Sequence, residues 1–255
     1  MKNLFDIKGK VAIVTGGSRG IGEMIAAGFV ENGAKVYITA RKADACNATA
    51  ERLSEKGTCI SLPHDLSNLD GIQRFVKKIE EREEKVDILC NNAGAAWGEP
   101  LDQYPESGWD KVFDINIKGP FFLIQKMLPL LRKAATAESP ARIINTASIN
   151  GIEPPVLETY AYSSSKAGMI MLTRHLAGRL ARENILVNSI APGPFPSHMM
   201  AATLAEMGDQ IKAANPRGRV GEPEDIAGVA IFLASRASAY TTGACIPCDG
   251  GAAEV

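Results

Sequence analysis

Short apolar runs alternate with longer stretches of helical periodicity along almost the whole chain. The apolar runs have the length and residue types of buried strands. They lie at 11–15, 35–40, 58–66, 86–94, 141–148 and 185–193, and ACIPCDGG at 244–251 is expected to add the last strand. The helical stretches lie at 21–33, 44–56, 69–84, 110–135, 160–182 and 224–235. This alternation predicts a series of βαβ units.

The predicted units define a fold class. Strands that alternate with helices of this length favour a parallel sheet, and right-handed crossovers bring the carboxyl ends of its strands to one edge. No repeat, low-complexity linker or shift of composition divides the 255 residues. We therefore predict a single α/β domain over residues 1–255, a doubly wound parallel sheet of Rossmann type with helices on both faces.

The segment 194–222 differs from the rest of the chain in its residue types. It is rich in Pro, Met and Gly and connects a predicted strand to a predicted helix. Connections of this length inside a compact domain are usually functional, and many of them close over a substrate. We predict a substrate lid at about 194–222.

Charge and cysteine content narrow the range of partners. Basic and acidic residues number 28 and 29, so the formal net charge is −1 and no global field attracts nucleic acid or an anionic membrane. The first ten residues contain no apolar core of signal-peptide length, and no run is long enough to span a membrane. Five cysteines without framework spacing fit a reducing compartment, so a cytoplasmic location is expected.

The residue types that bind metals do not cluster in the sequence. Cys245 and Cys248 form a C-x-x-C in a predicted strand, but no second pair completes a zinc site, so we interpret them as ordinary thiols. His64, His175 and His198 are widely separated, and each is interpreted as structural. No metal site is predicted.

A glycine-rich turn, TGGSRGIG at 15–22, follows the first predicted strand and opens the first predicted helix. Such a turn lets the backbone approach a pyrophosphate, and the N–H groups at the helix start bind the phosphates. A glycine-rich turn without a ligand is the alternative. The dinucleotide-binding prediction includes Gly16, Ser18, Arg19, Gly20, Ile21 and Gly22.

The end of the second strand indicates which dinucleotide binds. NAD-binding proteins usually have an Asp or Glu there for the ribose 2′-hydroxyl, whereas this strand ends Thr39-Ala40-Arg41. Arg41 and Arg19 are suited to hold a 2′-phosphate, because a planar guanidinium binds phosphate in a bidentate manner. We therefore predict NADP(H) as the cofactor.

Tyrosine and lysine occur together in YAYSSSKAG, residues 160–168. A free tyrosine has a pKa of about 10, too high for efficient acid–base work near neutral pH, and a nearby ammonium lowers it. Tyr162 and Lys166 are four residues apart and share a helix face, while Tyr160 lies about 120° around the helix from that lysine. The spacing selects Tyr162 as the candidate general acid and leaves Tyr160 to line a pocket.

Four patterns in this order resemble the classical short-chain dehydrogenase/reductase family. They are TGGSRGIG, NNAG at 91–94, Ser148 ahead of the tyrosine and lysine, and NSIAPG at 188–193. The resemblance covers nearly the whole chain and is closest to 3-oxoacyl-ACP/CoA reductases of the rhamnolipid-biosynthesis type. It implies NADPH-dependent reduction of a ketone to a secondary alcohol, with a 3-oxoacyl thioester as substrate.

The resemblance also implies roles for individual residues. Tyr162 would protonate the substrate carbonyl, Lys166 would lower the pKa of that tyrosine and hold the nicotinamide ribose, and Ser148 would hydrogen-bond the same carbonyl. Asn116 would hold a water that links the lysine to solvent. Further cofactor contacts are implied for Asp65, Leu66, Asn92, Ala93, Gly94, Pro192, Gly193, Phe195 and Ser197, together with Tyr162 and Lys166.

The resemblance implies partners as well, and it leaves alternatives open. A homotetramer, or a homodimer through the helices at 110–135 and 160–182, is implied, and acyl carrier protein is a candidate partner. Gly178 stands where such reductases usually place a basic residue toward the carrier, although Arg132, Lys133 and Arg174 are candidates to replace it. Reduction of another carbonyl, such as a steroid, sugar, quinone or xenobiotic ketone, is the main alternative. A non-catalytic NADP sensor is a further one.

Overall fold

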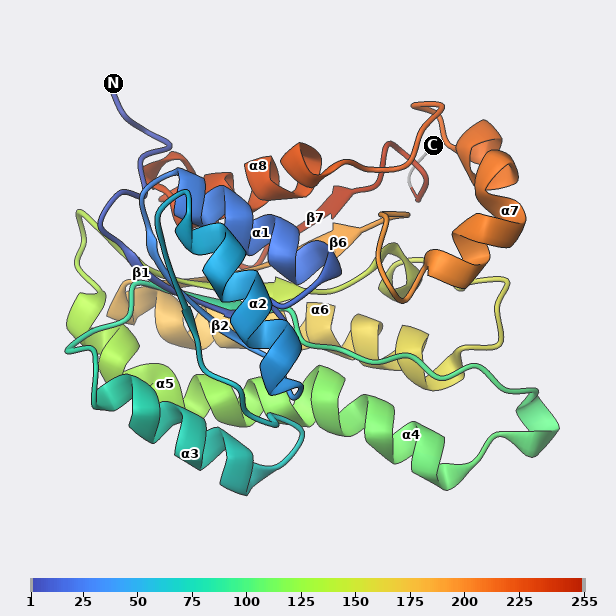
Figure 1. Ribbon diagram of the computed structural model, residues 1–255, viewed down its shortest axis with the longest axis horizontal. Coiled ribbons are helices and arrows are strands. Elements are labelled where there is room, and N and C mark those ends of the chain that lie inside the picture. The colour runs from blue at the N-terminus through green and yellow to red at the C-terminus, as the bar shows by residue number, and fades with distance from the viewer. Residues whose placement is uncertain (1, 254–255) are drawn as a thin grey trace.

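A seven-stranded sheet, parallel throughout, forms the centre of the protein in the computed structural model, which describes residues 2–253 (Figure 1). The strands are β1 (Val11–Thr15), β2 (Lys35–Thr39), β3 (Thr58–Ser61), β4 (Ile88–Asn91), β5 (Ala141–Thr146), β6 (Ile185–Pro192) and β7 (Cys245–Cys248). Their order across the sheet is β3-β2-β1-β4-β5-β6-β7. The predicted fold class is therefore confirmed.

Helices cover both faces of this sheet (Figure 1). The α-helices are α1 (Gly20–Glu31), α2 (Ala43–Ser54), α3 (Leu69–Glu80), α4 (Glu106–Phe113), α5 (Gly119–Ala134), α6 (Tyr160–Leu180), α7 (Ala201–Ala214) and α8 (Pro223–Ala234). The short helical turns are η1 (Leu101–Gln103), η2 (Asp114–Lys118), η3 (Ile149–Gly151), η4 (Ala181–Glu183) and η5 (Arg236–Ser238).

The hydrophobic core lies in two layers because successive strand residues point to opposite faces. Val36 and Ile38 of β2 pack in the layer that includes α1, α2 and α8. Tyr37, between them, packs in the layer that includes α3, α5 and α6. Helices on both faces explain why the strands are continuously apolar rather than alternating.

The order of the strands places a crevice between β1 and β4. The chain winds outward from β1 through β2 to β3, then crosses back to β4 and winds outward in the other direction. Ligands of open α/β sheets bind at this reversal, outside the carboxyl ends of the strands. The loops that follow β1 and β4 contain TGGSRGIG and NNAG, so both motifs lie at this edge.

The predicted helix at 110–135 is interrupted in the structure. α4 ends at Phe113, a π-helical turn follows in η2, and α5 begins at Gly119. The turn directs the buried Asn116 into the fold, where its side chain is hydrogen-bonded on both its nitrogen and its oxygen. Single π turns inside helices are frequently found at functional sites.

Two further segments differ from the prediction. The strand expected at 58–66 ends at Ser61, because Pro63 cannot donate to a sheet ladder. The segment 194–222, expected to be a loop, contains α7, and no residue of α7 is buried. α7 projects at the end of the molecule (Figure 1). Because it does not pack on the core, it lacks the buried apolar stripe from which a helix is predicted.

Among the helices within residues 2–253, none combines the length and the apolar character that a membrane span requires.

Candidate active site

Ser148, Tyr162 and Lys166 come together where β5 ends and α6 begins. Ser148 follows β5 with extended backbone and is buried. Tyr162 lies in the first turn of α6, and the Lys166 Nζ atom is 5.6 Å from the centroid of its ring. That Nζ donates a hydrogen bond to the carbonyl of Thr146, at 2.7 Å. The four-residue spacing thus gives the shared helix face that was predicted.

The segment after Ser148 lies directly against α6. A Cβ atom built on Gly151 would be only 2.5 Å from the carbonyl carbon of Lys166. Any side chain at this position would push η3 away from the helix. Glycine therefore allows the close approach that holds Ser148 beside Tyr162.

Burial raises the pKa of Tyr162, and its hydrogen bond with Ser148 acts in the opposite direction. Burial also lowers the pKa of Lys166, from 10.5 to about 8. Both shifts favour the uncharged forms, because a phenolate or an ammonium loses hydration in the interior. The sequence predicted that the charge of Lys166 would lower the pKa of Tyr162. In the structure the loss of hydration is the larger effect, and the pKa of Tyr162 is raised.

Asn116 connects the loop after β4 to the start of α6. Its Nδ2 donates to the carbonyl of Ala95 at 3.0 Å and to Oγ of Ser165 at 2.9 Å, and its Oδ1 accepts from the Ala95 N–H. Ser165 in turn donates to the carbonyl of Tyr162 at 2.7 Å. These bonds fix the first turn of α6 relative to the crevice.

Ser165 and Thr15 belong to the site although the sequence did not select them. Ser165 lies between the two selected residues of YAYSSSKAG, but a serine one residue before a lysine has no distinctive spacing. Thr15 Oγ1 accepts from the N–H groups of Asn92 and Ala93, each at 2.9 Å. Thr15 thereby joins the loops of TGGSRGIG and NNAG, and its position as the last residue of β1 was the available signal.

Tyr160 faces away from this group. Its hydroxyl donates to Oε1 of Glu158 at 2.9 Å, and its ring lies edge-on to that of Tyr104, with centroids 5.8 Å apart. The structure therefore separates the two tyrosines of YAYSSSKAG as the helical spacing predicted. The pocket-lining role of Tyr160 remains a prediction.

Glycine is required where the loops after β1 and β4 touch. Gly16 has a φ of 66°, in the left-handed region, and a Cβ there would be 2.9 Å from Cα of Ala93. A Cβ on Gly22 would be 2.3 Å from Nδ2 of Asn92 and 2.4 Å from the carbonyl oxygen of Gly16. The motif therefore packs as the dinucleotide fingerprint requires.

The start of α1 has the features of an anion site. Arg19 precedes the helix with extended backbone, and no side chain caps the first N–H groups. Arg19 and Arg41 are exposed, and within residues 2–253 neither guanidinium has a hydrogen-bond or ion-pair partner. Both are therefore available to a phosphate.

The other predicted cofactor residues lie around the carboxyl edge of the sheet, and their side chains differ in how accessible they are to a cofactor. Ser197 approaches Gly20, where a Cβ would be 3.1 Å from that of Ser197. Asp65 Oδ1 accepts from the Ser67 N–H, and Leu66 is buried. The Phe195 side chain is also buried in the core, so Phe195 and Leu66 could contact a cofactor only through their backbone.

The remaining predicted positions range from buried to exposed. Pro192 ends β6 and is buried, and Gly193 donates its N–H to the carbonyl of Cys248 at 3.0 Å. Ser18 uses its carbonyl to accept from Thr49, and Ile21 packs against the core. Gly94 is exposed beside Asn116 and Lys166. All of these residues lie near the carboxyl edge of the sheet.

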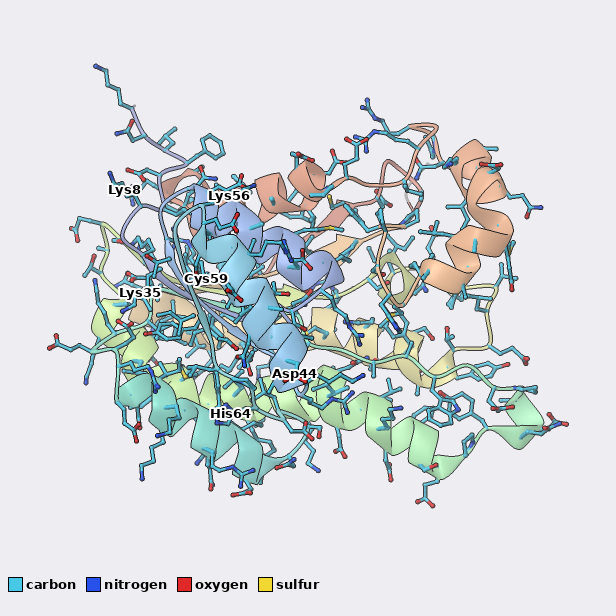
Figure 2. The ribbon with its side chains drawn as sticks, viewed as in Figure 1. Lys8, Lys35, Asp44, Lys56, Cys59 and His64 are labelled. Carbon is cyan, nitrogen blue, oxygen red and sulfur yellow. The ribbon has the colours of Figure 1, made fainter. Side chains whose placement is uncertain are left out.

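The histidines do not converge. His64 packs edge-on against Phe75 beside α3 (Figure 2), with ring centroids 5.6 Å apart. Within the described residues, no group of three or more His, Cys, Asp or Glu side chains could hold a metal ion.

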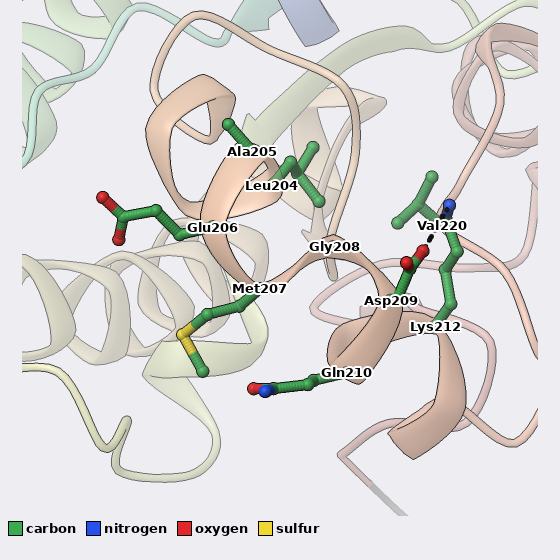
Figure 3. Close-up of a pocket in the computed structure, with 9 residues that line it drawn as sticks. All are labelled: Leu204, Ala205, Glu206, Met207, Gly208, Asp209, Gln210, Lys212 and Val220. Atoms are coloured by element: carbon green, nitrogen blue, oxygen red, sulfur yellow. Dashed lines mark hydrogen bonds and ion pairs between the residues drawn. The ribbon is translucent and has the colours of Figure 1, made fainter.

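α7 borders a hollow of about 530 Å³ on the segment predicted to be a lid (Figure 3). Leu204, Gly208 and Val220 contribute to its lining, and Lys212 is ion-paired with Asp209 at its rim. No residue of α7 is buried. Its function as a lid remains a proposal.

Comparisons with known proteins agree with this arrangement. The family model described as Enoyl-(Acyl carrier protein) reductase matches residues 16–253. The rhamnolipids biosynthesis 3-oxoacyl-[acyl-carrier-protein] reductase of Pseudomonas aeruginosa is 49% identical over 253 residues, which cover 98% of this chain and 99% of that protein. The 3-oxoacyl-[acyl-carrier-protein] reductase FabG of Chlamydia pneumoniae is 37% identical, covering 95% of this chain and 96% of that protein.

Solved structures show the same likeness in three dimensions. The Pseudomonas aeruginosa RhlG/NADP active-site complex superposes with a TM-score of 0.95 at 49% sequence identity. The match covers 99% of this chain and 100% of the other. The fold is therefore shared over nearly the whole chain.

Proposed function

Because this chain belongs to the short-chain dehydrogenase/reductase family, we propose that it uses NADPH to reduce a 3-oxoacyl thioester to the 3-hydroxyacyl thioester. The observation that carries the proposal is the group of Ser148, Tyr162 and Lys166, assembled beside the glycine-rich loop. The chain is an oxidoreductase of this family, and its relatives of 49% and 37% identity bear the names of 3-oxoacyl reductases.

The residues around the crevice fit a dinucleotide phosphate. The uncapped start of α1 offers N–H groups to the pyrophosphate, and Gly16 and Gly22 keep the loop close to NNAG. At the end of β2, Arg41 stands where NAD-binding proteins have a carboxylate, and Arg19 lies at the start of α1. Two unpaired guanidiniums favour the 2′-phosphate of NADP.

In the proposed mechanism, bound NADPH supplies the hydride that adds to the carbonyl carbon. Ser148 donates a hydrogen bond to the carbonyl oxygen and orients it. Tyr162 donates its phenolic proton to that oxygen as negative charge develops there. Its raised pKa keeps the phenol protonated until the substrate requires the proton.

Lys166 and Asn116 complete the proposed proton path. The Lys166 ammonium lies near the phenol and compensates the charge that forms on Tyr162 when the proton leaves. With a pKa of about 8, this lysine can itself lose and regain a proton near neutral pH. Asn116 fixes the start of α6, and we assign it the water that reconnects Lys166 with solvent.

The proposed carrier of the acyl group is acyl carrier protein or coenzyme A. Arg132 and Arg179 both form ion pairs with Glu183, with N–O distances of 2.6 and 3.0 Å, so part of the basic charge near the ends of α5 and α6 is already neutralised. Within the described residues Lys133 and Arg174 have no acidic partner. We assign docking of an acidic carrier to these two side chains.

We also propose a homotetramer, or a homodimer, that forms through the helices α4 to α6. Phe121 of α5 and Met171 of α6 are exposed, the latter by 61%. Apolar side chains on neighbouring surface helices are typical of an interface between copies. The cytoplasmic location stays a prediction.

An assay of NADPH oxidation with a panel of ketones tests the proposed function. The panel contains 3-oxoacyl-CoA, 3-oxoacyl-ACP, a steroid ketone and a diketone, each with NADPH and with NADH. We expect the highest kcat/KM with a 3-oxoacyl thioester and NADPH, and a 3-hydroxyacyl product. Tighter binding of NADH than of NADPH would refute the role of Arg41, and a preference for the steroid or diketone would refute the substrate class.

A further inference from the structure

Thr49 of α2 contacts the glycine-rich turn from outside the motif. Its hydroxyl donates to the carbonyl oxygen of Ser18 at 2.9 Å, and the residue is only 5% exposed. A threonine inside a helix can instead bond a carbonyl of its own preceding turn. Here the hydroxyl joins two elements that are 31 residues apart in the chain. α2 and α1, the helix that the turn opens, lie side by side on one face of the sheet (Figure 1).

The position of Thr49 is fixed by the packing of α2. Cys46, Ala50 and Leu53, which share its helix face, are buried in the core. Sγ of Cys46 also lies 3.6 Å from the carbonyl oxygen of Ile38 in β2. A hydroxyl on a packed helix face has few alternative positions, so Thr49 gives the carbonyl of Ser18 a rigid support.

The carbonyl that Thr49 holds belongs to the peptide that leads into Arg19. The Ser18 carbonyl and the Arg19 N–H share one planar peptide group, so a bond that fixes one also fixes the other. Arg19 has extended backbone, with φ −171° and ψ 164°, directly before the first residue of α1. It is exposed, and within residues 2–253 its guanidinium has no partner. The direction in which Arg19 leaves the turn therefore depends on the bond from Thr49.

The second arginine is attached to the same helix. Arg41 lies two residues before Ala43, the first residue of α2. α2 thus directly follows Arg41 and also holds the turn that leads into Arg19. Two guanidiniums bind one phosphate well only when both reach its oxygens in a bidentate geometry. NADPH has a 2′-phosphate where NADH has a hydroxyl, so only NADPH depends on the relative position of the two arginines.

We propose that Thr49 is a positioning residue for the cofactor, which holds Arg19 in place relative to Arg41 and thereby raises the preference for NADPH over NADH. The inference rests on the proposed function, in which both arginines bind the 2′-phosphate, and adds the residue that sets their spacing. Thr49 acts through the turn that it supports.

Binding measurements with both dinucleotides test this role. The Kd values of NADPH and NADH are measured by fluorescence for the wild type, Thr49→Val and Thr49→Ser. Valine keeps the branched shape without the hydroxyl, whereas serine keeps the hydroxyl. Circular dichroism verifies that each variant is folded, and Thr49→Ala replaces the valine variant if that variant does not fold.

Ser54→Ala is the matched control. Ser54 lies in the same helix, and its hydroxyl donates to the carbonyl oxygen of Cys59 in β3 at the same distance, 2.9 Å. Its loss removes an equivalent bond between α2 and the rest of the fold without touching the glycine-rich turn.

In Thr49→Val, the ratio of the NADH Kd to the NADPH Kd should fall about three- to tenfold relative to wild type. Thr49→Ser and Ser54→Ala should keep the wild-type ratio. In an Arg19→Gln background Thr49→Val should cause no further fall, because the threonine acts through that arginine. A wild-type ratio in Thr49→Val, an equal loss for both dinucleotides, the same fall in Ser54→Ala, or a further fall in the Arg19→Gln background would overturn the inference.

The inference and the proposed function fail in different ways. A wild type that binds NADH as tightly as NADPH contradicts the proposed 2′-phosphate site itself. A wild type that prefers NADPH, with that preference unaltered in Thr49→Val, contradicts the role of Thr49 alone.

Discussion

The ammonium of Lys166 is buried without a carboxylate partner, and its Nζ bonds only to a backbone carbonyl among the described residues. Burial lowers its pKa from 10.5 to about 8, because the interior solvates the charge poorly. The enzyme thereby holds a lysine that changes charge near neutral pH beside a tyrosine that stays protonated. This pair could be located from sequence spacing, but the direction of its pKa shifts could not, since burial is a property of the packed fold.

The lowered pKa of Lys166 should be visible in the pH dependence of stability. Between pH 8 and 10.5 the unfolded chain binds the lysine proton and the native state does not, so the free energy of unfolding rises with pH by at most about 1.4 kcal/mol per pH unit. Lys166→Met removes this contribution. In urea unfolding at several pH values, the free energy of unfolding of the wild type should therefore rise relative to that of the variant across this interval. Parallel curves for the two proteins would contradict the buried, easily deprotonated lysine.

The loops after β1 and β4 meet as one unit. The sequence predicted that the carboxyl ends of the strands share one edge of the sheet, but it did not predict this contact. Their detailed support, in which Thr15 accepts from two N–H groups of NNAG, depends on the register of neighbouring strands. The π-helical turn at Asn116 and the helix α7 were not predicted. A π turn keeps the chain helical between α4 and α5, so a sequence pattern does not reveal it. α7 has no buried residue and therefore lacks the buried stripe from which a helix is predicted.

Gly22→Ala tests the close packing of these loops. The added methyl group would lie 2.4 Å from the carbonyl oxygen of Gly16, so the backbone must shift and the free energy of unfolding should fall by about 1–3 kcal/mol. NADPH affinity should fall as well, because the phosphate-binding loop moves. Gly178→Ala is the matched control, since its Cβ would meet open space in helix α6 and favour helix formation. A Gly22→Ala protein with wild-type NADPH affinity would contradict this role of the loop.

The molecule as a whole presents apolar surface on α5 and α6 while its net charge is close to zero. This surface is the basis of the proposal that copies associate through these helices. Met171→Lys places a charge in the proposed interface and should shift the mass measured by light scattering toward the monomer. Tyr240→Lys introduces the same charge elsewhere and should leave the mass unaltered. A monomeric wild type, or an unchanged mass for Met171→Lys, would contradict the proposed interface.

The architecture was the most predictable property of the protein, because seven parallel strands with helices on both faces follow from alternating periodicity and crossover handedness. The residues that can contact a cofactor were less predictable. Arg19 and Arg41 could be proposed as phosphate ligands from their places in the glycine-rich turn and at the end of the second strand. The side chains of Phe195 and Leu66 lie in the core instead, and only the packed fold decides this.

The central claim is that Tyr162 is the acid of an NADPH-dependent reduction. Tyr162→Phe removes one hydroxyl and keeps the ring that packs at the start of α6. Turnover of the best 3-oxoacyl thioester should fall about 10²- to 10⁴-fold, while the Kd for NADPH, followed by fluorescence, stays close to that of the wild type. Near wild-type turnover of Tyr162→Phe would contradict the account.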